Sequence, residues 1–151
     1  MGSIDWKLLV DLGTLFSVLV ALAGLVVTMR TFRRQTNVQL FLAFTDRYDS
    51  IIRSFPPDAR KARLDAKNEP LPDSEQLRAA ILRYLNLCSE EYHLYRHGYL
   101  SRTVWEMWEP QIKRTLRSRM FRRAWPDLED EFIDHPHFVA YVRAVQAEEK
   151  G

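Results

Sequence analysis

The feature that most constrains this chain is an uninterrupted apolar run at residues 12–29, which a basic cluster follows directly. The run holds eighteen residues without a charge. At a helical rise of about 1.5 Å per residue it extends about 27 Å, close to the hydrocarbon thickness of a bilayer. We therefore predict one transmembrane helix over 12–29, with Arg30, Arg33 and Arg34 at the inner interface.

A cleaved signal peptide is the alternative for this run, because the Ala-Leu-Ala sequence at residues 21–23 resembles a cleavage site. The order of charges opposes that alternative, since the residues before the run carry two acids against one base and the arginines come after it. The positive-inside rule then places residues 1–11 outside, as a short extracytoplasmic N-terminus, and everything after the run in the cytoplasm.

Small residues form a stripe along the predicted span. They recur every fourth position and then after three, at Gly13, Ser17, Ala21 and Gly24. Such a stripe lets a second helix approach closely, which predicts self-association or a protein partner through the membrane helix. The alternative is that these residues reflect only the ordinary composition of spanning helices.

The segment after the span is predicted to continue as a helix. Residues 30–55 contain no proline or glycine, and their apolar positions recur at spacings of three and four, which indicates an amphipathic juxtamembrane helix. Its apolar face could lie on the bilayer or pack on the soluble domain, and the mixed charges of its polar face favour packing. Two prolines end it and open a linker at 56–73, with a short helix over 57–66.

The remaining residues, 74–149, are predicted to form a small cytoplasmic helical bundle, so the predicted fold class is all-α. One helix begins at Asp73 or Ser74 and stops at Gly98, where a glycine can cap it. A second begins after Ser101 and is kinked or restarted at Pro110. A short turn near residues 121–125, an acidic helix over 127–133 and a last helix over 136–148 complete the prediction.

Length and composition allow one anchor and one soluble domain. The 151 residues leave roughly 115 beyond the span, enough for a single core. The formal net charge of +2 does not argue for nucleic acid. The lone cysteine, Cys88, cannot form an internal disulfide and falls within an apolar helical pattern, which fits a reduced compartment.

One pair of residues has the spacing of metal ligands. Glu90 and His93 lie three apart on one helix, as in helical di-iron proteins, which use this pair twice. The second copy is missing here, and a solvated or structural pair is favoured even with Glu106 and Glu109 nearby. No nucleophile turn or phosphate-cradling loop is evident, so we predict no cofactor and favour a non-enzymatic chain.

A basic run covers residues 113–123 without an acid. Its members are Lys113, Arg114, Arg117, Arg119, Arg122 and Arg123. The run could contact anionic lipid of the inner leaflet, an acidic partner surface or, less favourably, nucleic acid. The plainer alternative is a solvated face that is partly neutralised by the five acids of residues 127–134.

Aromatic residues are concentrated in the predicted soluble domain. They include Tyr84, Tyr92, Tyr95, Trp105, Trp108, Phe121 and Trp125. Aromatic residues at helical spacing favour a core, and a ligand pocket is the alternative.

Several short motifs make the chain resemble a family of uncharacterised bacterial single-pass membrane proteins with a cytoplasmic all-helical domain. The motifs are Tyr84-Leu85-Asn86, Glu90-Glu91-Tyr92, Leu94-Tyr95, Gly98-Tyr99-Leu100, Trp105-x-x-Trp108 and Ala124-Trp125. They cover about residues 77–142 and are structural in character. The resemblance implies architecture and a bacterial inner membrane, and it implies no activity.

Together these observations predict a membrane-tethered, non-enzymatic interaction or accessory module, such as a small subunit of a larger membrane complex. An enzyme with a metal or small-molecule site near Glu90 and His93 is the first alternative. Binding of anionic phospholipid or nucleic acid through residues 113–123 is the second.

Overall fold

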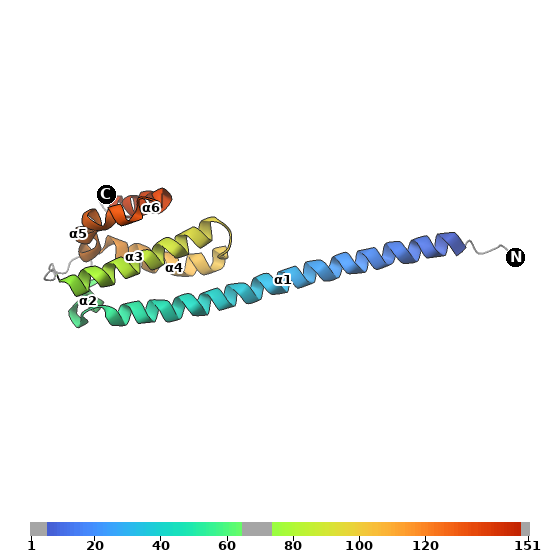
Figure 1. Ribbon diagram of the computed structural model, residues 1–151, viewed down its shortest axis with the longest axis horizontal. Helices are drawn as coiled ribbons and strands as arrows, with labels where there is room; N and C mark the ends of the chain where they lie inside the picture. Colours follow the sequence, from blue (N-terminus) through green and yellow to red (C-terminus); the bar gives the residue numbers. More distant parts are fainter. Residues whose placement is uncertain (1–5, 65–73, 149–151) are drawn as a thin grey trace. The chain divides into compact units, whose positions relative to one another are not determined.

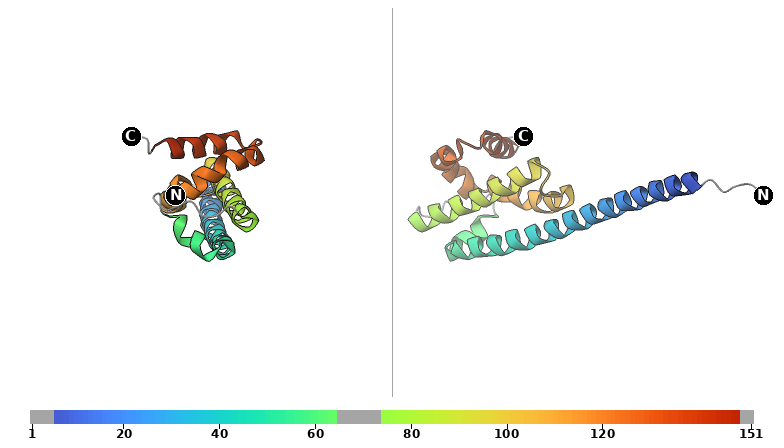
Figure 2. Two further views of the ribbon diagram at one scale, coloured as in Figure 1. Left: turned by 90° about the vertical axis from the view of Figure 1, so that its left-hand side faces the viewer. Right: turned by 45° about the vertical axis from the view of Figure 1, so that its right-hand side comes forward.

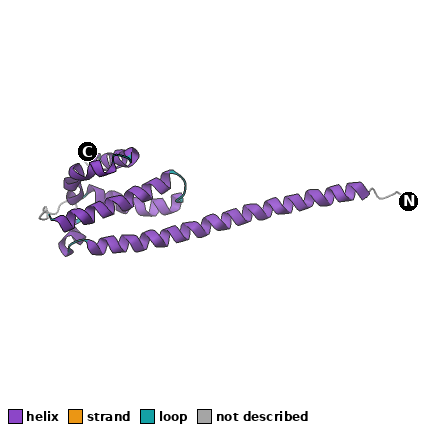
Figure 3. Ribbon diagram, in the orientation of Figure 1, coloured by secondary structure: helices purple, strands orange, loops and turns teal. Residues whose placement is uncertain are grey.

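The computed structural model describes residues 6–64 and 74–148, except for the side chains of residues 6–12, 33 and 34. The described chain consists of helices joined by short turns, with no strand among these residues (Figure 3). The all-helical prediction is therefore confirmed. Residues 1–5 of the expected extracytoplasmic segment lie outside the described residues, as do positions 65–73 of the predicted linker.

The first helix, α1, runs from Trp6 to Ser54 (Figure 1). The chain divides into two compact units, residues 1–39 and 40–151, and the boundary falls inside this helix. Within the first unit, residues 13–32 are all exposed. Within the described chain, α1 is the one helix long and apolar enough to cross a membrane.

Polar side chains in the apolar part of α1 are satisfied by the helix itself. The Ser17 hydroxyl donates to the carbonyl of Gly13, and the Thr28 hydroxyl donates to the carbonyl of Gly24, both at 2.9 Å. Such bonds to the preceding turn leave these hydroxyls without need of water, which is the requirement a bilayer imposes.

The second unit contains all the other helices. They are α2 (Pro57–Ala62), α3 (Glu75–Arg96), α4 (Arg102–Arg117), α5 (Arg119–Leu128), the 3₁₀-helix η1 (Glu129–Phe132) and α6 (Pro136–Ala147). Serine caps begin three of these helices. The hydroxyls of Ser74, Ser101 and Ser118 accept the backbone N–H of the residue three positions later. At the end of α3, Gly98 has a φ of +72°, which a glycine adopts without strain.

Three details differ from the sequence prediction. Helix α4 does not restart at Pro110 but continues through it to Arg117. The predicted turn near residues 121–125 is a full helix, α5. The predicted acidic helix over 127–133 does not exist as one element, because its first two residues finish α5 and the next four form η1. The acidic residues of this segment fit the sequence pattern of a helix start. The seven residues of 127–133 are nevertheless too few to form a stable separate α-helix.

The helices of the second unit lie in three layers. Residues 40–54 of α1 lie on one side of α3 and α4, and α5 and α6 lie on the other (Figures 1 and 2). A single apolar core joins the layers, and it includes Phe55 from the end of α1, Tyr84 from α3, Leu116 from α4 and Val142 from α6. Burial of these side chains is the main favourable term that holds the unit together.

Candidate functional site

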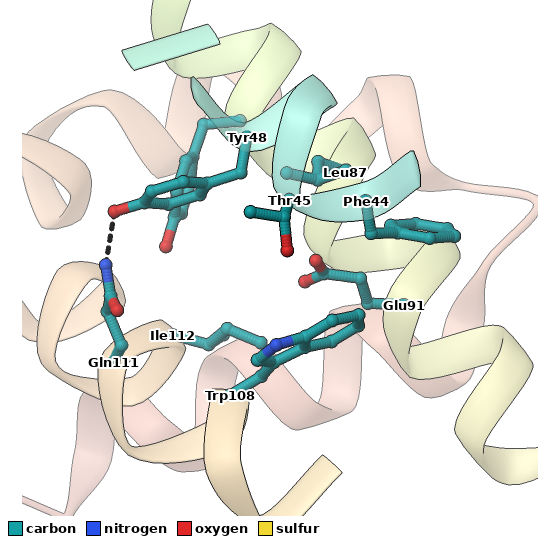
Figure 4. A pocket seen from close by; sticks show the side chains of 9 residues that line it. Phe44, Thr45, Tyr48, Leu87, Glu91, Trp108, Gln111 and Ile112 are labelled. Carbon is teal, nitrogen blue, oxygen red and sulfur yellow. Dashed lines mark hydrogen bonds between the residues drawn. The ribbon is translucent and has the colours of Figure 1, made fainter. Parts of the chain in front are cut away.

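A cavity of about 210 Å³ lies inside the second unit, between α1, α3 and α4. Each helix contributes three of its lining residues, which are Phe44, Thr45, Tyr48, Tyr84, Leu87, Glu91, Trp108, Gln111 and Ile112. Figure 4 shows the carboxyl group of Glu91 pointing into the space between the α1 and α4 side chains. The cavity is therefore mostly aromatic and aliphatic, with one carboxyl group.

Helical spacing explains why Glu91 reaches this position. Tyr84, Leu87 and Glu91 lie three and four residues apart, so they share the face of α3 that turns toward α1 and α4. Phe44 and Tyr48 use the same spacing on α1, and Trp108 and Ile112 use it on α4. The sequence prediction missed Glu91 and centred on its neighbour Glu90; the signal that could have identified Glu91 is an acid on the same helical face as Tyr84 and Leu87.

The environment of Glu91 disfavours its ionised form. The residue is 6% exposed, and its carboxyl group has no hydrogen bond among the contacts of the described residues. Its oxygens are not among the fully buried polar atoms that lack a partner, so they border the accessible space of the cavity. Burial raises the pKa of this carboxyl to about 8, the negative charge of Glu90 raises it further, and the positive charge of Arg47 opposes both. Near neutral pH, Glu91 therefore holds a proton in most molecules.

Two polar contacts join the walls of the cavity. Arg47 on α1 donates two hydrogen bonds to the carboxylate of Glu90 on α3, one of them from Nη2 to Oε1 at 2.9 Å. Gln111 on α4 donates to the hydroxyl of Tyr48 on α1 (Figure 4). These contacts fix α1 against both other helices at the level of the cavity.

The Glu90 and His93 pair is not organised as a metal site. Glu90 forms an ion pair with Arg47, and the ring centroids of His93 and His97 lie 4.1 Å apart. Glu106 pairs with Arg102, and Glu109 pairs with Lys113. Among the described residues, no group of three or more His, Cys, Asp or Glu side chains is placed to hold a metal ion.

A second hollow of about 290 Å³ brings the histidines together. The four histidines of the chain all line it: His93 lies on α3, His97 caps the end of α3, and His135 and His137 lie at the start of α6. The prediction from sequence considered His137 only as a partner of Asp134, which lines the same hollow. The hollow carries no metal geometry among the described side chains.

The basic run at 113–123 is divided by the fold. Ser118 ends α4 and caps α5, so the six cations lie on two helices. Lys113 pairs with Glu109, Arg114 donates to the carbonyl of Leu64 at 3.0 Å, and Arg117 contacts Glu148 and the Val145 carbonyl.

The other three cations differ in exposure. Arg119 and Arg123 are exposed, and Arg122 is partly buried. Arg114 and Arg117 join α4 to other segments, and Lys113 is paired within α4, which reduces the charge that the run offers to lipid or nucleic acid.

The predicted membrane-helix residues lie in the first unit. Gly13, Ser17, Ala21 and Gly24 are exposed, and no described atom lies within 4 Å of a Cβ built on either glycine. Arg30 is also exposed. The side chains of Arg33 and Arg34 lie outside those that the structure describes.

The aromatic residues pack in or against the core, and two of them also line the cavity. Trp105, Phe121 and Trp125 are buried in the core, and Tyr92 and Tyr95 pack against it. Tyr84 and Trp108 line the cavity. The stacked pair formed by Phe41 and Trp108, with ring centroids 5.7 Å apart, extends the aromatic wall along α1.

Comparison with known proteins adds no relative. No protein-family model, no curated protein and no solved structure matches the chain.

Proposed function

We propose that this chain is a membrane-anchored, non-enzymatic binding module, whose small helical bundle receives a ligand in the cavity around Glu91. The observation that carries the proposal is the buried carboxyl group of Glu91, which faces an aromatic cavity and has no hydrogen bond from a described residue. Its oxygens border the accessible space of the cavity, so a ligand that enters this space would pair with the carboxyl group in place of water.

The anchor rests on the apolar run and its flanking charges. Exposed large apolar side chains are densest on α1 between Leu15 and Phe32, where they make far more apolar surface than a water-facing helix tolerates. With arginines following the run, the second unit lies in the cytoplasm of a bacterial cell and the amino terminus outside. The amphipathic segment of 30–55 then contributes the α1 wall of the cavity.

The small-residue stripe of the anchor supports a further protein contact. Gly13, Ser17, Ala21 and Gly24 leave room for the backbone of another helix to approach. This contact would make the chain an accessory subunit, or a self-associating one, in a larger membrane complex.

A screen of ligands against the full-length chain in maltoside micelles tests the binding function. We expect at least one small molecule to raise the melting temperature, because a ligand that binds only the folded state stabilises it. The matched variant is Thr45→Phe, which fills the cavity from an exposed position on α1 and removes only the bond from the Thr45 hydroxyl to the Phe41 carbonyl. Stabilisation that persists in Thr45→Phe contradicts binding in this cavity.

A proton-transfer enzyme is the second candidate, and the pKa of Glu91 favours it. A carboxyl group whose pKa lies at about 8 can give and take a proton near neutral pH, as general acid–base catalysts do. The two candidates differ in what becomes of the ligand. A binding module returns it unchanged, whereas an enzyme exchanges a carbon-bound hydrogen with deuterated water at a rate that Glu91→Gln abolishes.

A further inference from the structure

The cavity around Glu91 has a composition that selects among ligand charges. Its polar groups are one carboxyl, the hydroxyls of Thr45 and two tyrosines, the Gln111 amide and the indole N–H of Trp108, and no Lys or Arg lines it. The carboxylate of Glu90 lies beside it on α3. Arg47 pairs with Glu90 and no cation lines the cavity, so an anionic ligand would find no opposite charge there, whereas a cationic ligand can pair with Glu91 once it ionises.

Two aromatic rings line the cavity beside Glu91, and one of them, Trp108, is also stacked on Phe41. Phe44 and Trp108 line the cavity with ring centroids 5.9 Å apart and planes inclined at 41°. The Tyr48 ring already carries the guanidinium of Arg63, which lies 5.7 Å from its centroid. That contact shows a ring of this cavity in use as a platform for a cation.

We propose that the cavity binds a small organic ammonium ion, held between the carboxylate of Glu91 and the rings of Phe44 and Trp108. This inference rests on the proposed function and names its ligand class. The carboxylate supplies the opposite charge, and the ring faces attract a weakly hydrated, alkylated cation more than a strongly hydrated one. A volume of about 210 Å³ accepts a trimethylammonium group with a short chain.

Binding is coupled to the loss of one proton. The protonated carboxyl of Glu91 releases its proton to the buffer, and the resulting carboxylate pairs with the incoming quaternary ion, which brings no proton of its own. Below about pH 8 the affinity should therefore rise by up to about tenfold per pH unit, and above it the affinity should level off.

The groups around Glu91 indicate that Glu91 alone releases the proton when the ligand binds. α4 presents Trp108, Gln111 and Ile112, none of which titrates. The titratable and charged groups on the other elements are Arg47 and Tyr48 on α1, Arg63 after α2, and Tyr84, Cys88 and Glu90 on α3. Burial raises the pKa of Tyr84 and of Cys88 well above their usual values, so both stay neutral through this range.

The test compares choline with its uncharged isostere, 3,3-dimethylbutan-1-ol, on the full-length chain. Maltoside micelles are required because zwitterionic detergents carry the same ammonium group. Titration calorimetry above pH 8 should give choline at least about tenfold the affinity of the alcohol. Calorimetry near pH 7 in two buffers of different ionisation enthalpy should show release of one proton per choline bound.

Two variants separate the carboxylate from the rings. Glu91→Gln should cost choline about tenfold in affinity, abolish proton release and leave the alcohol unaffected, and Trp108→Leu should weaken choline binding severalfold. The matched control is Glu131→Gln, which removes the same charge from an exposed position on η1 and should change nothing. Melting temperatures confirm that each variant is folded.

A second set of measurements, in nanodiscs, distinguishes a lipid headgroup from a free amine as the natural ligand. In phosphatidylglycerol nanodiscs choline should bind as in micelles. If phosphatidylcholine nanodiscs abolish the choline signal, the lipid headgroup occupies the cavity, and if they do not, the ligand is a free amine.

The failures of the two proposals are distinguishable. Equal binding of choline and the alcohol, with both lost in Thr45→Phe, would overturn the ammonium inference and leave the binding function standing. The same holds if neither probe binds while another ligand from the screen stabilises the chain through the cavity. If neither choline nor any ligand of the screen binds in the cavity, both the ammonium inference and the binding function are overturned.

Discussion

At the scale of the residue, the chemistry of this protein is concentrated on two adjacent glutamates of α3. Glu90 faces outward and pairs with Arg47, whereas Glu91 is turned by one residue into the apolar face and stays unpaired among the described residues. One step along a helix rotates a side chain by about 100°, which is enough to separate a solvated ion pair from a buried acid.

The buried acid should make stability depend on pH. Because the pKa of Glu91 rises from 4.5 to about 8 on folding, the folded chain binds more protons than the unfolded chain between these values. Its free energy of unfolding should therefore fall as pH rises across that window, by up to about 1.4 kcal/mol per unit. Thermal unfolding of wild type and Glu91→Gln from about pH 5 to about pH 9 measures this. The variant should lose the slope, and an equal slope in both would contradict the assignment.

The two charged neighbours should move the pKa of Glu91 in opposite directions. Arg47→Gln removes the cation that lowers this pKa, so the midpoint of the pH profile should rise. Glu90→Gln removes the anion that raises it, so the midpoint should fall. Because the Arg47–Glu90 pair is about half exposed, each change should cost only about 0–1 kcal/mol of stability. Shifts of the same sign would rule out this electrostatic account.

At the scale of the element, caps and stops decided where the helices lie. Local chemistry predicted that α3 begins at Asp73 or Ser74 and ends near Gly98; the structure has Ser74 as the cap and the stop at Gly98. The turn from α4 to α5 escaped prediction, since one residue, Ser118, serves both as the end of one helix and the cap of the next. Nothing in the periodicity marks such a shared residue, and the basic run continues across it.

The glycine stop of α3 gives a stability prediction. Gly98→Ala should lower the free energy of unfolding by about 1–2 kcal/mol, because an L side chain at a φ of +72° is strained. Gly98→Asn is the matched variant and should lose less, since asparagine visits this conformation more readily. Chemical denaturation of the full-length chain measures the free energy of unfolding of wild type and of the two variants. If alanine costs no more than asparagine, backbone strain is not what selects glycine here.

At the scale of the whole molecule, the described chain is all helical, as the sequence predicts, and the cavity is its least predictable feature. Hydrophobic periodicity identified helix faces but not which faces meet. The cavity requires α1, α3 and α4 to converge on residues more than sixty positions apart, such as Phe44 and Trp108. The candidate metal pair therefore drew attention to Glu90 and His93, one and two positions away from the side chain that lines the cavity.

The anchor is tested by placing a charge in its centre. Leu22→Arg should impair membrane insertion, because arginine at the middle of a spanning helix costs about 2.5–3.5 kcal/mol. Leu42→Arg is the matched control, since Leu42 is an exposed leucine of α1 that lies beyond the apolar run. Extraction of membranes at alkaline pH should release Leu22→Arg and retain both wild type and the control. Release of wild-type chain under these conditions would contradict the anchor.

The most direct measurement of the central claim is the ionisation of Glu91 itself. Carbon-13 NMR of glutamate-labelled, full-length chain in maltoside micelles follows each carboxyl group with pH, and the signal lost in Glu91→Gln identifies this one. We expect it to titrate at about pH 8 and to shift to lower pH when choline is added. An ordinary glutamate titration that choline does not change would contradict the account of this cavity as a binding site.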